Sequence, residues 1–292
     1  MNWDKDWLET MYNNRARVPE AESYIARWIE SSAIARTQLA SQAKLNIAYG
    51  DSAKETLDIF LPEHIDPNNP PPVFVFIHGG YWHALDKDNF SFIAPEFVKA
   101  GACVIVINYT LCPNIKVSGI VKEIESAIIW IKRNIAQYGA NPEHITVSGH
   151  SAGGHLTAMM FAHDWLHLLP ELNQTSPFKN GLALSGLYDM APLQHTPFLQ
   201  ILALDEHDVE YSSPITLPCL AKQSVLSAIV GGNESEAFIQ QNQSIQNHWG
   251  KEIVPVCQAI AGLDHFSIVE ALVQPDNELH KHALKLLQLI NK

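Results

Sequence analysis

One short stretch, residues 144–154, constrains the fold more than any other part of the chain. Near its start, Ile145-Thr146-Val147 is typical of the end of a buried strand, and the residues after Gly153 are typical of a helix. The turn between them, Gly149-His150-Ser151-Ala152-Gly153, fits the G-x-S-x-G pattern of a sharp strand-to-helix turn. Small residues two positions before and after the serine are a steric necessity there. We therefore expect Ser151 to be a nucleophile at the end of a sheet.

The rest of the chain alternates strands with helices and predicts an α/β fold. Two short alternating stretches are expected to pair as an antiparallel hairpin at the sheet edge, and continuous apolar runs are expected in its centre. This spacing indicates a mostly parallel central sheet with helices on both faces. The predicted strands are residues 44–49, 56–61, 73–77, 103–109, 145–147, 181–185, 224–230 and 254–260, and the predicted helices cover about 90–100, 119–138 and 236–249.

Length and pattern predict a single domain, residues 1–292, with two segments outside the regular alternation. Residues 1–40 form an N-terminal helical arm that either packs on the main body or serves as a partial lid. Residues 190–220 hold four prolines and suggest short helices across one rim of the sheet, a second candidate lid. The arm helix is expected from about Glu20 to Gln38, and the side chains that share one face are Tyr24, Ile25, Trp28, Ile29 and Ser32.

Composition narrows the class of partner. A net charge of −12 and a pI near 5.5 argue against nucleic acid or an anionic membrane surface, because either would repel an acidic chain. No signal peptide is evident and no apolar run approaches a membrane span. Four cysteines without metal-site spacing suit a reducing compartment. We expect a cytoplasmic protein with a small-molecule substrate; a homodimer is compatible with the sequence.

A serine nucleophile needs a base, and the base needs an acid to orient it. His265 lies in a loop after the last predicted strand, so we expect it to be the base. Glu234 follows the preceding strand directly and is the preferred acid. Asp189, one strand earlier, is the main rival, with Glu236 behind it. Asp264 is discounted, since adjacent side chains rarely point together.

The run His78-Gly79-Gly80 after a buried strand is typical of an oxyanion loop, where glycines let the backbone approach the substrate. The expected amide donors are those of Gly80 and Tyr81, joined by Ala152 after the nucleophile. His78 is interpreted as a clamp on the loop. Tyr81 and Trp82 are either core aromatics or a wall that binds substrate, and we take them as substrate-binding residues.

One pair of histidines resembles a metal site. His163 and His167 stand at helical i and i+4 spacing, as in the H-E-x-x-H pattern, but the second position is aspartate and no third ligand is evident. Neither a phosphate-binding glycine loop nor a dinucleotide fingerprint occurs. We expect no metal and no organic cofactor.

These motifs together resemble the α/β-hydrolase fold near the hormone-sensitive-lipase-like esterases. The form His78-Gly79-Gly80-Tyr81-Trp82 is similar to that of the kynurenine formamidases (arylformamidases). Further matches are Tyr12 to Arg15, Gly232 to Phe238, Asp264 to Phe266 and Ile268 to Glu270.

The resemblance implies Ser151 as nucleophile, Glu234 as acid and His265 as base, with hydrolysis of N-formyl-L-kynurenine as the activity. Better-known members of the family use aspartate at the position of Glu234. Two alternatives stay open: a carboxylesterase for small acyl or aryl esters, and a non-catalytic binding protein of the same fold.

Overall fold

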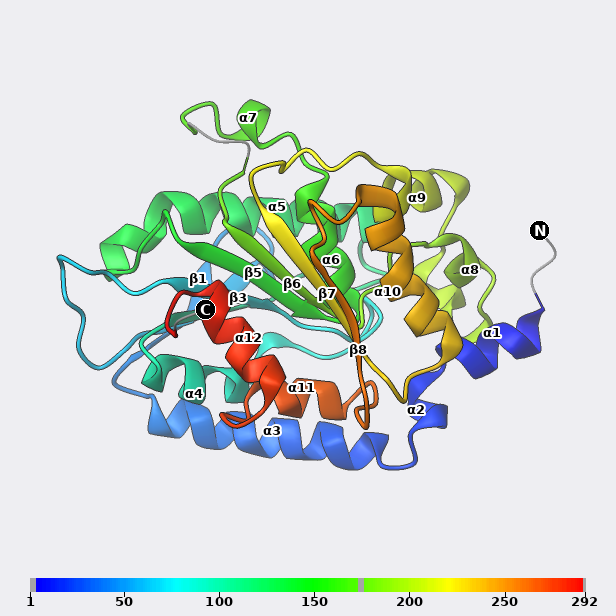
Figure 1. The fold of residues 1–292 in the computed structure, drawn as a ribbon, viewed down its shortest axis with the longest axis horizontal. Helices are drawn as coiled ribbons and strands as arrows, with labels where there is room; N and C mark the ends of the chain where they lie inside the picture. Colours follow the sequence, from blue (N-terminus) through cyan, green and yellow to red (C-terminus); the bar gives the residue numbers. More distant parts are fainter. Residues whose placement is uncertain (1–3, 173–175, 291–292) are drawn as a thin grey trace.

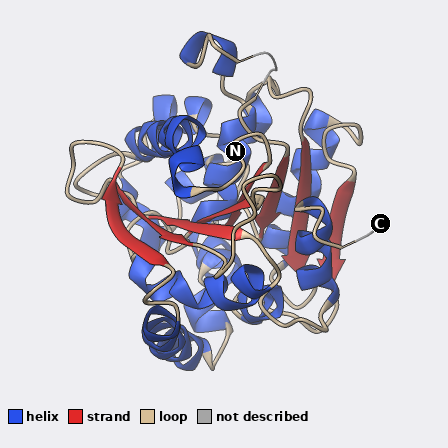
Figure 2. Ribbon diagram, turned by 90° about the vertical axis from the view of Figure 1, so that its left-hand side faces the viewer, coloured by secondary structure: helices blue, strands red, loops and turns tan. Residues whose placement is uncertain are grey.

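The computed structural model describes residues 4–172 and 176–290, and these form one central sheet of eight strands between two layers of helices (Figures 1 and 2). The strand order is β1-β2-β4-β3-β5-β6-β7-β8. The first three strands of this order pair antiparallel, and every other pair is parallel. The strands are β1 (Ala43–Ala48), β2 (Thr56–Phe60), β3 (Val73–Ile77), β4 (Cys103–Ile107), β5 (Ile145–His150), β6 (Asn180–Leu184), β7 (Val225–Gly231) and β8 (Val256–Ile260). The predicted mostly parallel sheet with an edge hairpin is therefore confirmed.

The central strands are apolar on both faces because both faces are covered. All five residues of β3 are buried, and alternate side chains enter two separate cores. Val73, Val75 and Ile77 belong to one core, whereas Phe74 and Phe76 belong to the other. This two-residue alternation is the geometry of a strand with a layer of helices on each side.

Each core is closed by its own set of helices. The core that contains Val75 is covered by α5 (Val117–Asn134), α6 (Ala152–Phe161) and α10 (Glu236–Trp249). The core that contains Phe74 is covered by α3 (Ala21–Gln38), α4 (Ala94–Lys99), α11 (Ser267–Leu272) and α12 (Glu278–Leu286). In Figure 1, α3 runs along the bottom of the molecule below α4 and α11, and α5 runs along the top.

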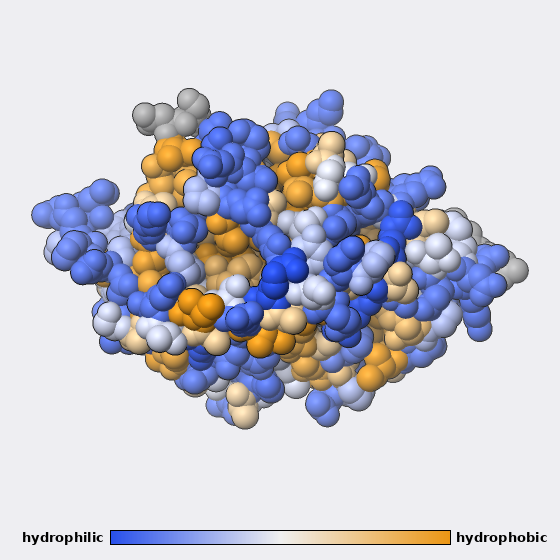
Figure 3. Space-filling model, turned by 90° about the horizontal axis from the view of Figure 1, so that it is seen from below, coloured by the Kyte–Doolittle hydropathy of each residue, from blue (hydrophilic) through white to orange (hydrophobic). Residues whose placement is uncertain are grey.

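The N-terminal arm consists of α1 (Lys5–Tyr12), α2 (Asn14–Arg17) and α3. The predicted bounds of α3 are confirmed to within one residue, but its predicted buried face is wrong in part. Ile29 is 48% exposed, and the buried positions are instead Ala21, Ile25, Trp28, Ser32 and Ala35. The face of the molecule that carries α3 accordingly shows apolar patches among polar side chains (Figure 3).

Other expected helices differ in their ends. The segment predicted to be a helix at 90–100 begins earlier as a 3-10 helix, η1 (Lys87–Ile93), and continues as α4. The segment predicted at 119–138 is α5 followed by η2 (Ile135–Tyr138), and Gly139 ends it with a φ of +86°. The remaining short element before β6 is α7 (Trp165–Leu168).

Residues 190–220 form the short helices that the sequence predicts, α8 (Ala191–Gln194), η3 (Pro197–Leu202), α9 (Glu206–Tyr211) and η4 (Pro214–Thr216). In Figure 1, α8 and α9 lie above α1, beside α10. Within the described residues, no helix combines the length and apolar character that crossing a membrane requires.

Candidate active site

The turn at Ser151 has the strained geometry that its motif predicts. Ser151 joins β5 to α6 with φ +57° and ψ −117°, a conformation that costs roughly 1–3 kcal/mol for a non-glycine residue. A Cβ on Gly149 would strike the carbonyl of Gly153, and a Cβ on Gly153 would strike the carbonyl of Ile77. The two glycines of the motif are therefore required by backbone contacts on both sides of the serine.

Three side chains that follow three different strands meet at this turn. His265 Nε2 lies 3.1 Å from Ser151 Oγ, and His265 Nδ1 lies 2.6 Å from Glu234 Oε2. The second oxygen of Glu234 accepts hydrogen bonds from the Ser185 hydroxyl and from the Gly231 amide. All three predicted residues are at least 95% buried. The fold thus joins the predicted serine, acid and histidine in one chain of hydrogen bonds.

The rival acids are engaged elsewhere. Asp189 Oδ1 accepts from the Ala191 amide, and Glu236 accepts from Gln240 one helical turn away. Asp264 accepts from the amides of Phe266 and Ser267 at the start of α11. Glu234 is therefore the carboxylate that contacts His265.

The residues predicted to supply the oxyanion donors lie near Ser151, since Gly80 and Tyr81 line the same cavity as the serine and Ala152 follows it directly. Gly80 and Tyr81 have φ of +111° and +48°, and a Cβ on Gly80 would strike the carbonyl of Ala84. Across the described chain, no acceptor contacts the amides of Gly80, Tyr81 or Ala152. Ala152 opens α6, where first-turn amides have no intrahelical partner. Three unpaired donors beside a serine suit a developing negative charge.

His78 packs against this loop. Its ring is fully buried, stacks on Tyr109 at 4.2 Å between centroids, and places Nδ1 2.8 Å from the Gly79 oxygen. Burial lowers the pKa of His78 to about 4, so the ring is neutral near pH 7. These contacts agree with its interpretation as a clamp.

The two aromatic residues of the loop have different surroundings. Tyr81 lines the cavity in front of Ser151, whereas Trp82 is fully buried and does not line it. The Trp82 indole N–H donates to His155 Nδ1 on α6 at 3.3 Å. Trp82 therefore belongs to the core and not to the cavity wall. Its prediction as a substrate-binding residue is therefore wrong.

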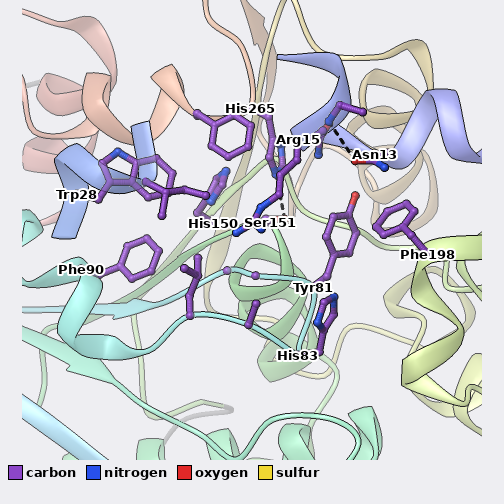
Figure 4. Close-up of a pocket in the computed structure, with 18 residues that line it drawn as sticks. Asn13, Arg15, Trp28, Tyr81, His83, Phe90, His150, Ser151, Phe198 and His265 are labelled. Carbon is purple, nitrogen blue, oxygen red and sulfur yellow. Dashed lines mark hydrogen bonds between the residues drawn. The ribbon is translucent and has the colours of Figure 1, made fainter. Parts of the chain in front are cut away.

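The cavity measures about 580 Å³ and is lined by segments far apart in the sequence. Trp28 and Phe90 lie on one side of Ser151, and Tyr81 and Phe198 lie on the other (Figure 4). Both candidate lid segments contribute, since Asn13 to Ala16 come from the arm and Phe198 comes from η3. No sequence signal marked Phe90 or Phe198 as site residues.

His150 is a site residue that was not predicted from the sequence, although it is part of the serine motif. It is buried, lines the cavity, and lies 4.6 Å from the His265 ring between centroids. Desolvation, and then the charge of nearby His265, lower the pKa of His150 well below its ordinary value. The His150 ring is therefore neutral near pH 7 and places no charge beside His265.

In the histidine pair with metal-like spacing, His163 and His167, the ring of His163 contacts other protein groups. His163 lies against Glu125 and the Met159 carbonyl, so both of its ring nitrogens have partners. A different group, Asp205, His207 and Asp208, has ligand atoms close together in the described part of the chain. The Lys116 ammonium already pairs with both aspartates of that group.

A mostly parallel sheet that presents an elbow serine, an acid and a histidine in this order has the architecture of a serine hydrolase. The BD-FAE family matches residues 57–180. The kynurenine formamidase of Danio rerio is 28% identical over 97% of this chain and 96% of its own.

Two solved structures share this fold. A candidate thioesterase from Silicibacter sp. TM1040 is 31% identical, with a TM-score of 0.79 over 92% of this chain and 95% of the other. Esterase B from Lactobacillus rhamnosis, at 18% identity, shares the fold with a TM-score of 0.69 over 93% and 96%. The chain therefore belongs to the α/β-hydrolase family, and within it is kynurenine formamidase-like.

Proposed function

We propose that this chain is a serine hydrolase of the arylformamidase type, which converts N-formyl-L-kynurenine and water to L-kynurenine and formate. The observation that carries the proposal is the buried hydrogen-bonded chain from Glu234 through His265 to Ser151. Similarity to a kynurenine formamidase over nearly the whole chain supports the choice of substrate. The free thiols support a cytoplasmic location as part of the same proposal.

The first half of the reaction leads to a formyl-enzyme through a tetrahedral intermediate. His265 Nε2 takes the proton of the Ser151 hydroxyl as the oxygen attacks the formyl carbon. Glu234 holds Nδ1–H of His265 and stabilises the imidazolium without accepting its proton. The neutral ring of His150 adds no charge that would oppose the imidazolium.

The tetrahedral oxyanion binds to the amides of Gly80, Tyr81 and Ala152. Each lost donor of this kind costs roughly 2.7–4 kcal/mol of transition-state stabilisation. His265 then gives its proton to the arylamine nitrogen, and the C–N bond breaks. Water deprotonated by His265 attacks the formyl-enzyme, and formate leaves as Ser151 recovers its proton.

A carboxylesterase for small acyl or aryl esters is the second candidate. The same residues would act on an ester, because only the leaving atom differs. The aromatic lining of the cavity favours this alternative, since Trp28 and Phe90 offer more apolar wall than a formyl group fills. A non-catalytic binding protein is the remote alternative.

A comparison of kcat/KM for N-formyl-L-kynurenine and 4-nitrophenyl acetate separates the two enzymes. We expect the formamide to be the better substrate. Turnover of the ester alone would contradict the formamidase proposal. The Ser151→Ala variant is the control: loss of all hydrolysis with an unchanged unfolding transition excludes the binding-protein alternative.

A further inference from the structure

Arg15 is the one side chain with a formal charge among the residues that line the cavity in the described chain. The other lining residues with polar groups are asparagines, Ser151, histidines, Tyr81 and Trp28, and no aspartate, glutamate or lysine takes part. Arg15 therefore places a positive charge at the cavity of a chain whose net charge is −12. In Figure 4, Arg15 lies above Ser151, beside His265 and on the side of Asn13. A cation at this place attracts an anionic part of a ligand.

The backbone that carries Arg15 is fixed to the rest of the site. Arg15 belongs to the one-turn helix α2, which Asn13 caps by accepting from the Ala16 amide. Three residues before Arg15, the Tyr12 carbonyl accepts from the Tyr81 hydroxyl. The cap fixes the turn that carries Arg15, and the bond between Tyr81 and Tyr12 holds the arm against the cavity, so the position of Arg15 relative to Ser151 is set by the fold.

The guanidinium of Arg15 is available to a ligand. Its ion-pair partner is Glu22, at 3.6 Å, and the two side chains are 55% and 75% exposed. A pair this open contributes little, because water and salt screen it. Arginine stays charged at all working pH values and offers two parallel N–H donors to a carboxylate. A carboxylate in the cavity is therefore a better partner than Glu22.

Asn14 gives a second sign that the arm meets a polar ligand. It is 97% buried and lines the cavity, yet neither amide atom of its side chain has a hydrogen-bond partner in the described structure. An unsatisfied buried amide costs roughly 1–3 kcal/mol. The atoms are inaccessible in this conformation, so the side chain must turn before it can bind a ligand. A polar group bound beside Arg15 would offer it a partner.

We propose that Arg15 is a specificity residue that binds a carboxylate on the leaving group of the substrate. A leaving group that takes its proton from His265 must lie beside that ring, and Arg15 lies on the same side of Ser151. The substrate class is then an aryl formamide or aryl ester whose leaving group carries a carboxylate. The inference deepens the proposed function and rests on it only for the identity of the bond that is cut.

A binding experiment tests this without any turnover. The probes are 4-oxo-4-phenylbutanoate, an aryl ketone with a carboxylate, and its neutral amide, with affinities measured by calorimetry. We expect the full chain to bind the carboxylate about tenfold more tightly than the amide, as for a charge-assisted hydrogen bond at a partly exposed site. Arg15→Gln should remove that preference. The matched control is Arg17→Gln, which changes an exposed arginine of the same helix outside the cavity lining and should keep it.

Equal affinity for the two probes, binding of neither, or an equal effect of Arg17→Gln would overturn the proposal. Turnover of N-formyl-L-kynurenine and of N-formylkynuramine, which lacks the carboxylate, reports separately on the proposed function. With Arg15→Gln we expect KM for N-formyl-L-kynurenine to rise about tenfold, while its kcat changes less than about twofold. Both KM and kcat for N-formylkynuramine should also change less than about twofold. If neither formamide is hydrolysed but the binding preference depends on Arg15, the formamidase proposal fails and the carboxylate site stands.

Discussion

The Tyr81 hydroxyl donates a hydrogen bond to the backbone oxygen of Tyr12, which joins the oxyanion turn to the N-terminal arm. Ser235, the residue after Glu234, donates to the Met11 oxygen one residue earlier in the arm. The arm is thus bonded to both the donor side and the acid side of the site. The arm therefore lines the cavity and also helps to hold the oxyanion turn and Glu234 in place.

Tyr81→Phe should weaken this connection while leaving the Tyr81 amide in place. Burial holds the pKa of the Tyr81 hydroxyl well above its ordinary value, so the group stays protonated and can donate. We expect the free energy of unfolding to fall by about 0.5–1.5 kcal/mol, the usual worth of one hydrogen bond. The value of kcat/KM should fall about three- to tenfold, because the turn loses its tie to the arm. Urea unfolding and steady-state kinetics measure the two effects.

The matched control for that change is Tyr211→Phe. Tyr211 is 53% exposed and outside the cavity lining, so its hydroxyl should be dispensable for both properties. Equal behaviour of the two variants would show that the bond between Tyr81 and Tyr12 has no effect of its own.

Glu234→Gln should lower kcat by about 10⁴-fold, the size known for the matching acid-to-amide change in such triads. The amide removes the negative charge that stabilises the His265 imidazolium, while its shape preserves the packing. Asp189→Asn should change kcat less than tenfold, since Asp189 accepts from the Ala191 amide instead. A larger loss in the Asp189 variant would move the acid assignment to that residue.

Trp82→Phe should affect stability and leave substrate binding alone. The change removes the hydrogen bond to His155 and leaves a small cavity in the core, so we expect a loss of about 1–3 kcal/mol in the free energy of unfolding. Phe198→Ala is the opposite case, because Phe198 forms a cavity wall against Tyr81. That variant should raise KM with less effect on stability. A raised KM in Trp82→Phe would restore its predicted contact with substrate.

The protein should lose stability as the pH falls from about 6.5 to about 4. Burial lowers the pKa of His78 and of His155 to about 4. The unfolded chain binds protons on these residues below about pH 6.5, whereas the folded chain does not. The contribution of the two neutral histidines to the free energy of unfolding is therefore complete above about pH 6.5. It is lost as the pH falls through their folded pKa of about 4. Each histidine contributes a slope of about 1.4 kcal/mol per pH unit within this window.

Urea unfolding at several pH values measures the slope. His155→Gln should reduce it by about one proton while lowering stability near pH 7, because His155 also binds the Ser212 carbonyl. An unchanged slope in this variant would mean that His155 is not the neutral buried group described here.

Residues with a local steric or chemical requirement could be predicted from the sequence. The glycines around Ser151 are needed because backbone carbonyls lie where their side chains would be. The apolar runs of the central strands are needed because both faces of the sheet are buried. Glu234 and His265 were identifiable because parallel strands bring their carboxyl ends to one edge.

Other features were decided by contacts between distant segments. Trp82 is next to Tyr81 in the sequence, yet the turn sends one into the core and the other into the cavity. Ile29 lies on the exposed side of α3 because the helix packs on η1 and Phe266 through a narrower stripe than the apolar pattern suggests.

The sequence by itself determined the sheet, the elbow and the order of the three residues joined at Ser151, because each depends on local backbone geometry or strand order. Only the tertiary structure decided which aromatic and polar side chains form the cavity. Arg15 and Phe198 lie far apart along the chain and have no periodic pattern that links them to Ser151. Their place beside the serine depends on how the arm and η3 pack across the rim of the sheet.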